Sequence, residues 1–256
     1  MNLDAVDLSI LAPALAAGLL VTATHVPLGM QVLARGIVFI DLAIAQIAGC
    51  GVLLADQLGF EAQGAAVQLA ALAAALGGAL LLTWTERVWP EVQEAVIGVV
   101  FVLAATGGVL LLASNVHGSE HLRDLLVGQI LWVQRSRLLW AALAYAVILL
   151  LWFGGRERLG RTGFYILFAV AVTVSVQLVG LYLVFTTLIV PPLATRRMAR
   201  GRLPAAWALG AAGYAAGLLL STTLDLPSGP VIVWTLVALA VLAQAFVNRR
   251  IREATA

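Results

Sequence analysis

The stretch GFYILFAVAVTVSVQLVGLYLVFTTLIVPPLA, residues Gly163–Ala194, decides the fold class. It contains no charged residue, which is typical of a segment surrounded by lipid and other apolar helices. At about 1.5 Å per residue, it is too long for a single membrane-crossing helix. Ser175, Gln177 and Gly180 lie at its middle. We therefore predict a broken-helix pair near residues 163–194, because transporters place broken helices where backbone lines a cavity.

Apolar runs of similar character fill most of the remaining chain. Hydrophobic residues make up 62% of the sequence and charged residues only 11%, a ratio that a soluble domain of this length does not show. Five runs are clear and two are shorter or more interrupted. In chain order, the seven runs are Leu8–Thr24, Ile37–Ala55, Gly64–Thr85, Ala95–Ala113, Leu138–Phe153, Pro204–Thr222 and Val231–Val247. With the broken pair they predict an all-α polytopic membrane protein of eight to nine transmembrane helices, in one permease domain, residues 1–256.

The arginines predict the orientation of these spans. Clusters at residues 196–202 and 249–252 are separated by two passes, so both can be cytoplasmic. Counting back from them places twelve arginines inside and three outside (Arg123, Arg135 and Arg137). This predicts an N-terminus outside and a C-terminus inside. In this scheme His25, which precedes Pro27 and Gly29, is expected in a cytoplasmic turn.

The sequence excludes an ATP-binding role for this chain. The phosphate-binding loop of ATPases ends in Lys-Ser or Lys-Thr, and the chain has no lysine. Any ATP hydrolysis must take place on a separate subunit, and we expect no enzyme activity and no bound cofactor here. Cys50 is the only cysteine, so neither an intramolecular disulfide nor a cysteine metal cluster can form within one chain.

One acidic residue interrupts an apolar run. Asp41 stands in IVFIDLAIAQIAG, and an intramembrane acid is a functional candidate because its burial costs at least a few kcal/mol. The alternative is a structural role near a helix end, paired with Arg35 or capping the helix. Gln46 follows five residues later, about 140° around a helix, so the two side chains do not share a face. Gln46 and Gln177 are candidates for the transport pathway. The alternative for Gln46 is an interhelical hydrogen bond, and the alternative for Gln177 is an ordinary short loop at the break.

A second candidate lies in NVHGSEHLRDLL, between the fourth and fifth spans. Imidazole and carboxylate groups suit zinc or manganese, and a four-residue spacing places two histidines on one helix face. The alternative is a solvated loop that leads into an amphipathic helix. The residues of this possible outer metal-capture site are His117, Glu120, His121 and Asp124.

Four stretches in this order resemble the membrane permease subunit of ABC-type zinc and manganese importers. They are LARGIVFIDLAIAQIAGCGVLLA, QEAVIGVVFVLAATGGVLLL, HLRDLLVGQILWV and SVQLVGLYLVFTTLIVPPLATRRMA. The resemblance implies a homodimer of permeases in the bacterial cytoplasmic (inner) membrane, a cytosolic ATP-binding subunit and an extracytoplasmic metal-binding protein. It implies that Asp41 is a candidate ligand of the transported zinc or manganese. It also implies that a cytoplasmic loop after the fifth span contacts the ATPase, here with Arg156, Glu157, Arg158 and Arg161.

The chain departs from the pattern of that family beside Asp41. Ile40 stands where the family has glycine, and Gln46 replaces a histidine that follows the acid at a spacing of four. Glutamine is a weak neutral ligand for zinc, so the change favours manganese or delivery without tight binding. A stand-alone secondary transporter remains the alternative function, although the chain shows no clear inverted repeat. A membrane scaffold or intramembrane enzyme is disfavoured because no His-Glu-x-x-His or Ser-His arrangement is present.

Overall fold

The computed structural model describes residues 8–60, 64–112 and 128–255, and within these ranges every regular element is helical. Eight described segments are long and apolar enough to cross a membrane, and a ninth apolar helix is shorter. This confirms the predicted helical membrane fold. The helices are α1 (Leu8–Arg35), α2 (Ile40–Gln57), α3 (Ala65–Val88), α4 (Gln93–Leu112), α6 (Arg135–Val179), α7 (Leu181–Ala194), α8 (Arg202–Leu224) and α9 (Ser228–Thr255), with short turns η2 (Pro90–Val92) and η3 (Ile130–Trp132).

Helix α6 contains two spans that fold back on each other. Its backbone leaves helical geometry at Gly155 and at Gly160, where φ is +58°. Only glycine adopts such an angle without strain. The result is a first arm, Arg135–Gly155, and a second arm, Arg158–Val179. The turn between the arms contains the segment that the resemblance assigns to ATPase contact.

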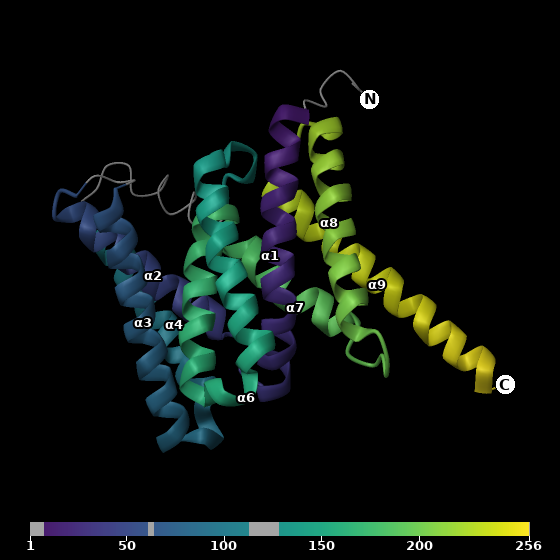
Figure 1. Ribbon diagram of the computed structural model, residues 1–256, viewed down its shortest axis with the longest axis horizontal. Coiled ribbons are helices and arrows are strands. Elements are labelled where there is room, and N and C mark those ends of the chain that lie inside the picture. Colours follow the sequence, from purple (N-terminus) through teal and green to yellow (C-terminus); the bar gives the residue numbers. More distant parts are fainter. Residues whose placement is uncertain (1–7, 61–63, 113–127, 256) are drawn as a thin grey trace.

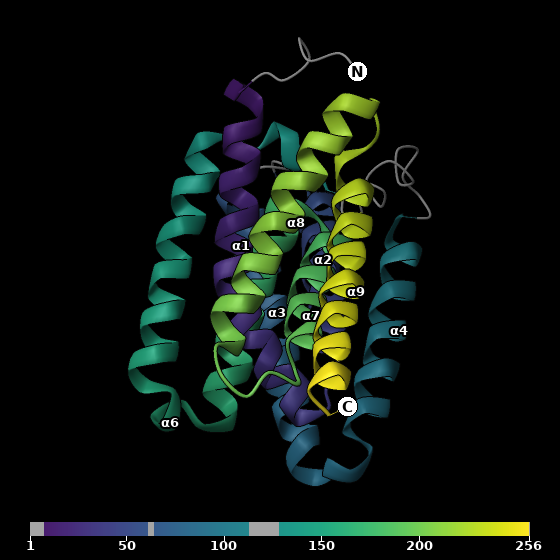
Figure 2. The same cartoon turned by 90° about the vertical axis from the view of Figure 1, so that its right-hand side faces the viewer.

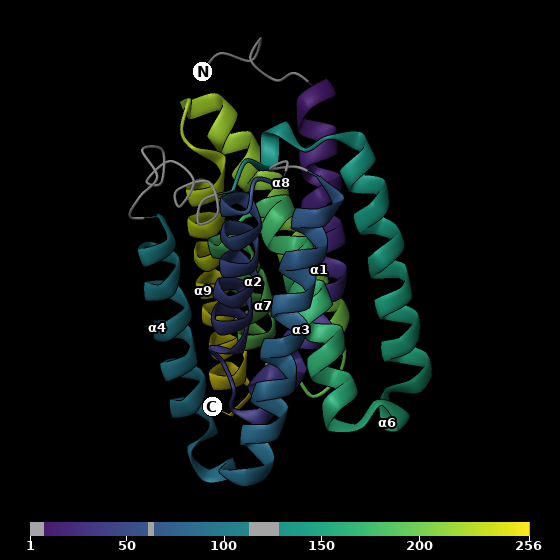
Figure 3. The same ribbon diagram turned by 90° about the vertical axis from the view of Figure 1, so that its left-hand side faces the viewer.

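The helices form a bundle with two flanking groups. Helices α2, α3 and α4 lie on one side and α7, α8 and α9 on the other, with α1 and α6 between them (Figure 1). Figure 2 shows α8 and α9 side by side, and Figure 3 shows α2 and α3 in front with α4 beside them. Helix α1 begins at one end of the bundle and α9 ends at the other (Figure 1).

The outer surface of the bundle is apolar, as a lipid-facing surface requires. Large side chains such as Trp234, Leu110 and Trp140 are exposed by 78%, 75% and 74%. Water would penalise this arrangement, whereas hydrocarbon does not. The buried side of the helices is instead rich in alanine and glycine, which allow close helix approach.

The predicted helix break lies at Gly180, between α6 and α7. Gly180 has φ +87°, and its N–H donates to the Val176 carbonyl. Gly128 packs directly on this break, because a Cβ there would stand 2.2 Å from the Val179 carbonyl oxygen. Ser175 itself remains helical, pairing with the Tyr145 hydroxyl and donating to the Ala171 carbonyl. The break is therefore a glycine hinge that follows the polar residues.

Helix α1 is longer than the apolar run predicted, and this corrects the expectation of a turn at His25. Pro27 lies inside the helix, where it cannot donate to the carbonyl four residues earlier. That carbonyl, of Ala23, instead accepts a hydrogen bond from Trp207 Nε1 at 3.3 Å. A tertiary contact thus provides the hydrogen bond that proline removes, and the helix continues to Arg35.

Backbone contact joins α1 to α7. Helix α7 continues through both of its prolines, so the carbonyl of Leu188 loses the N–H that residue 192 would otherwise supply. Gly29 lies against this oxygen, and a Cβ on Gly29 would be 1.8 Å from it. Nearby, the ring of Tyr214 covers Gly18, and its hydroxyl lies 2.9 Å from Thr187 Oγ1. Glycine at these positions sets the spacing of α1 from α7 and α8.

Candidate functional site

Asp41 is fully buried in the first turn of α2. Neither of its carboxylate oxygens meets a hydrogen-bond partner among the described residues. The alternative of an ion pair with Arg35 is not formed, since the Arg35 guanidinium lies over the Phe164 ring at 4.4 Å. A buried acid without a partner costs several kcal/mol. Such a group needs a proton or a cation.

Glu94 lies close to Asp41 and was not identified from the sequence. Its Oε1 accepts a hydrogen bond from the Phe39 N–H at 3.3 Å, two residues before Asp41. Phe39 is the N-cap residue of α2 and makes no side-chain cap of its own, so Glu94 caps α2 from another helix. The residues involved are 55 positions apart, and no local pattern indicates this contact.

His25 is also a buried titratable side chain, and it lies inside α1 rather than in the cytoplasmic turn that we predicted. Its Nδ1 lies 3.1 Å from the Val21 carbonyl oxygen and 3.2 Å from Thr24 Oγ1. Its Nε2 is buried without a partner in the part of the chain that the structure describes. No group of three or more His, Cys, Asp and Glu side chains gathers in that part. Within the described ranges, His25 and Asp41 thus share no group of three such side chains.

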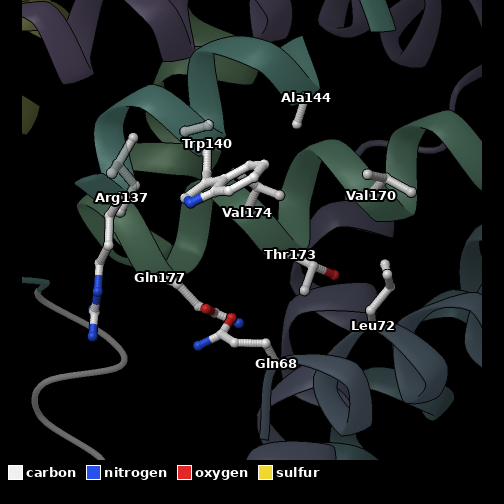
Figure 4. A pocket seen from close by; sticks show the side chains of 11 residues that line it. Gln68, Leu72, Arg137, Trp140, Ala144, Val170, Thr173, Val174 and Gln177 are labelled. Atoms are coloured by element: carbon white, nitrogen blue, oxygen red, sulfur yellow. The ribbon is translucent and has the colours of Figure 1, made fainter. Parts of the chain in front are cut away.

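Gln46 and Gln177 do not join Asp41. Gln46 is half-buried on the same helix, whereas Gln177 lines a groove of about 460 Å³ between α3 and the two arms of α6. In Figure 4 its side chain points toward that of Gln68. Gln68 lies near the start of α3, whereas Glu94 lies at the start of α4, which follows the end of α3. Gln177 and Asp41 are thus at opposite ends of the bundle.

A polar contact connects the turn of α6 to the end of α3. Arg161 Nε lies 3.5 Å from Glu86 Oε2, and Arg87 Nη2 donates to Thr162 Oγ1 at 2.8 Å. Gln93, buried at the start of α4, donates to the Leu82 carbonyl at 3.0 Å. These contacts link the α6 turn to the end of α3, and the end of α3 to the start of α4, where Glu94 lies.

The remaining predicted residues divide into two sets. Arg158 is exposed at the α6 turn, and Arg156 and Glu157 belong to the same turn of α6. The proposed outer metal-capture residues fall outside the described ranges, so that site stays a prediction. These residues are His117, Glu120, His121 and Asp124.

Comparisons with known proteins find one matching family and two structures of similar fold. The model of a family described as the ABC 3 transport family matches residues 7–160 and 154–247. No curated protein matches the chain in sequence. The structure titled PsaBC from Streptococcus pneumoniae in complex with Fab is similar at TM-score 0.77 and 20% identity, covering 98% of this chain and 100% of that one. A metal-chelate type ABC transporter in an inward-facing conformation is similar at TM-score 0.69 and 17% identity, covering 93% of this chain and 85% of that one.

Proposed function

Because the chain belongs to the ABC 3 transport family, we propose that it is the permease subunit of an importer for a divalent metal ion, zinc or manganese. The observation that supports this substrate is Asp41, a buried carboxylate without a partner in an apolar helix. A divalent cation is the ligand class that compensates such a charge. The chain itself supplies a pathway, and ATP is hydrolysed on a separate cytosolic subunit.

The proposed transport cycle uses alternating access. An extracytoplasmic binding protein delivers the ion near residues 114–124, where His117, Glu120, His121 and Asp124 assist capture. The ion then passes Asp41 between two copies of the permease in the bacterial inner membrane. ATP-driven closure of the ATPase subunits reaches the permease through the α6 turn, with Arg156, Glu157, Arg158 and Arg161. The chain acts without a cofactor, and the metal is the transported substrate.

Reconstitution tests this function against the alternative of a secondary transporter. We expect proteoliposomes that contain the chain and its ATPase, with ATP at the ATPase face and the binding protein at the opposite face, to accumulate radioactive manganese or zinc. Liposomes with the chain alone and a proton gradient should accumulate neither ion. Uptake by the chain alone, driven by the gradient and indifferent to ATP, would instead establish the secondary transporter.

The pair formed by Arg161 and Glu86 gives a test of coupling. Exposed ion pairs contribute at most about 1 kcal/mol to stability, and the Arg161 side chain is 47% exposed, so Arg161→Glu should leave the protein folded. We expect this variant, and Glu86→Arg, to reduce ATP-driven uptake severalfold, because each change places like charges together. The double charge reversal should restore most of the uptake.

Arg197 provides the matched control for this experiment. It is exposed in the connection between α7 and α8 and makes no ion pair among the described side chains. We expect Arg197→Glu to change uptake little. A loss of coupling in Arg197→Glu, with normal coupling in Arg161→Glu, would move the ATPase contact from the α6 turn to the α7–α8 connection.

A further inference from the structure

Two acidic side chains from different helices approach each other where α2 and α4 begin. The hydrogen bond from the Phe39 N–H to Glu94 Oε1, at 3.3 Å, places Glu94 beside the first turn of α2. Asp41 is in that turn, two residues further along. The fold thus brings together two carboxylates that are far apart in the sequence.

Three oxygens of this pair are buried without hydrogen-bond partners. Both carboxylate oxygens of Asp41 and the Oε2 atom of Glu94 are inaccessible to solvent and unpartnered within the described ranges. Asp41 has no exposed surface at all. Like charges in an apolar environment repel each other strongly, and each uncompensated oxygen adds a desolvation cost. The arrangement is stable only when positive charge is supplied.

The cations of the neighbouring helices have other contacts. Arg35, which precedes α2, lies over the Phe164 ring at 4.4 Å from its centroid. Arg161 pairs with Glu86 at the end of α3. Among the described side chains, neither arginine forms an ion pair with Asp41 or Glu94. The missing charge must therefore come from a proton or from a bound ion.

We propose that Asp41 and Glu94 together bind the transported divalent cation at the beginnings of α2 and α4, with Glu94 as a second carboxylate ligand. The proposal rests on the proposed function and narrows it. Two carboxylates neutralise a 2+ ion, and oxygen ligands suit manganese better than zinc, which favours nitrogen and sulfur. A site made of carboxylates needs no histidine four residues after Asp41, a position where this chain has Ala45.

A purely structural role of Glu94 is separable from metal binding. As the cap of α2, Glu94 needs only an oxygen that accepts from the Phe39 N–H. Glutamine keeps that oxygen and removes the negative charge. Glu94→Gln therefore preserves the cap and weakens cation binding, whereas a residue that only positions α2 would tolerate the change. Glu91, an exposed acid in η2, provides the control Glu91→Gln.

Manganese binding to the permease–ATPase complex in lipid nanodiscs tests the proposal. Free Mn²⁺ is titrated without ATP and followed by electron paramagnetic resonance. We expect Glu94→Gln to weaken binding by about tenfold to a hundredfold, the range found when groups around a metal are removed. Glu91→Gln should bind as the unmodified chain does. Equal thermal stability of all variants would show that the loss is not one of folding.

Two results would overturn the site. Unchanged manganese affinity in Glu94→Gln, together with lost affinity in Asp41→Asn, would remove Glu94 as a ligand and leave the importer function intact. A loss of manganese affinity in Glu91→Gln as large as that in Glu94→Gln would show a general effect of removing a nearby acid, and would also overturn the site. Failure of the proposed function looks different, because the complete transporter would then carry neither metal in liposomes.

Discussion

Asp41→Asn is expected to abolish ATP-driven metal uptake while the protein remains folded and inserted. Asparagine has nearly the same shape as aspartate but carries no charge, so the cation loses its main compensation in the apolar interior. Removing a buried and unpartnered carboxylate should leave the folded state equally stable or more stable, because its desolvation cost disappears. Uptake of radioactive manganese and zinc, together with the melting temperature, measures both effects.

Asp56→Asn is the matched control for this experiment. Asp56 lies in the last turn of the same helix and is partly exposed, so its loss should alter neither uptake nor stability appreciably. Normal transport by Asp41→Asn would place the ion pathway elsewhere. In that event, the buried imidazole of His25, with its unpartnered Nε2, would be the next group to test.

Gly29→Ala is expected to prevent correct packing of α1 on α7. The added Cβ would stand 1.8 Å from the Leu188 carbonyl oxygen and 2.9 Å from the Leu188 carbonyl carbon. Both are backbone atoms, so no side-chain rotation relieves the clash and the two helices must separate. We expect a loss of about 3 kcal/mol or more, at the upper end of the range for overpacked cores. Size-exclusion profiles and melting temperature in detergent provide the measurement.

Gly77→Ala in α3 is the control, because no heavy atom lies within 4 Å of its added Cβ. It should be neutral or stabilising by up to about 1 kcal/mol, since alanine has a higher helix propensity than glycine. Equal behaviour of the two variants would mean that α1 and α7 are further apart in the membrane than in this structure.

Composition was sufficient to predict the spans, because lipid imposes apolar side chains on every helix that crosses it. The helix ends in the structure differ from the apolar runs by a few residues, except in α9, which continues eight residues beyond Val247, and in α1, which continues eleven residues beyond Thr24. The reason is physical: proline forbids a local hydrogen bond, and the indole of Trp207 replaces it from another helix. A rule based on one helix alone cannot anticipate that replacement.

The candidate site was predicted only in part. Asp41 stands out because a charge in an apolar run is costly, and its burial in the structure agrees with that expectation. Glu94 looks like an ordinary acid at a helix start, and its approach to α2 depends on how α4 packs. Gln177 is the opposite case. Its position near the break drew attention to it in the sequence, but in the structure it faces a groove remote from Asp41.

The short helix α7 places a break in the backbone at membrane depth. Its 14 residues span about 21 Å at 1.5 Å per residue, less than the roughly 30 Å of a bilayer's hydrocarbon. With the Ala194 end at one face of the hydrocarbon, the Gly180 end lies below the opposite face. Lipid would leave polar backbone groups there without partners. Gly128 packs directly on the break instead, so this contact shields the interrupted backbone from hydrocarbon.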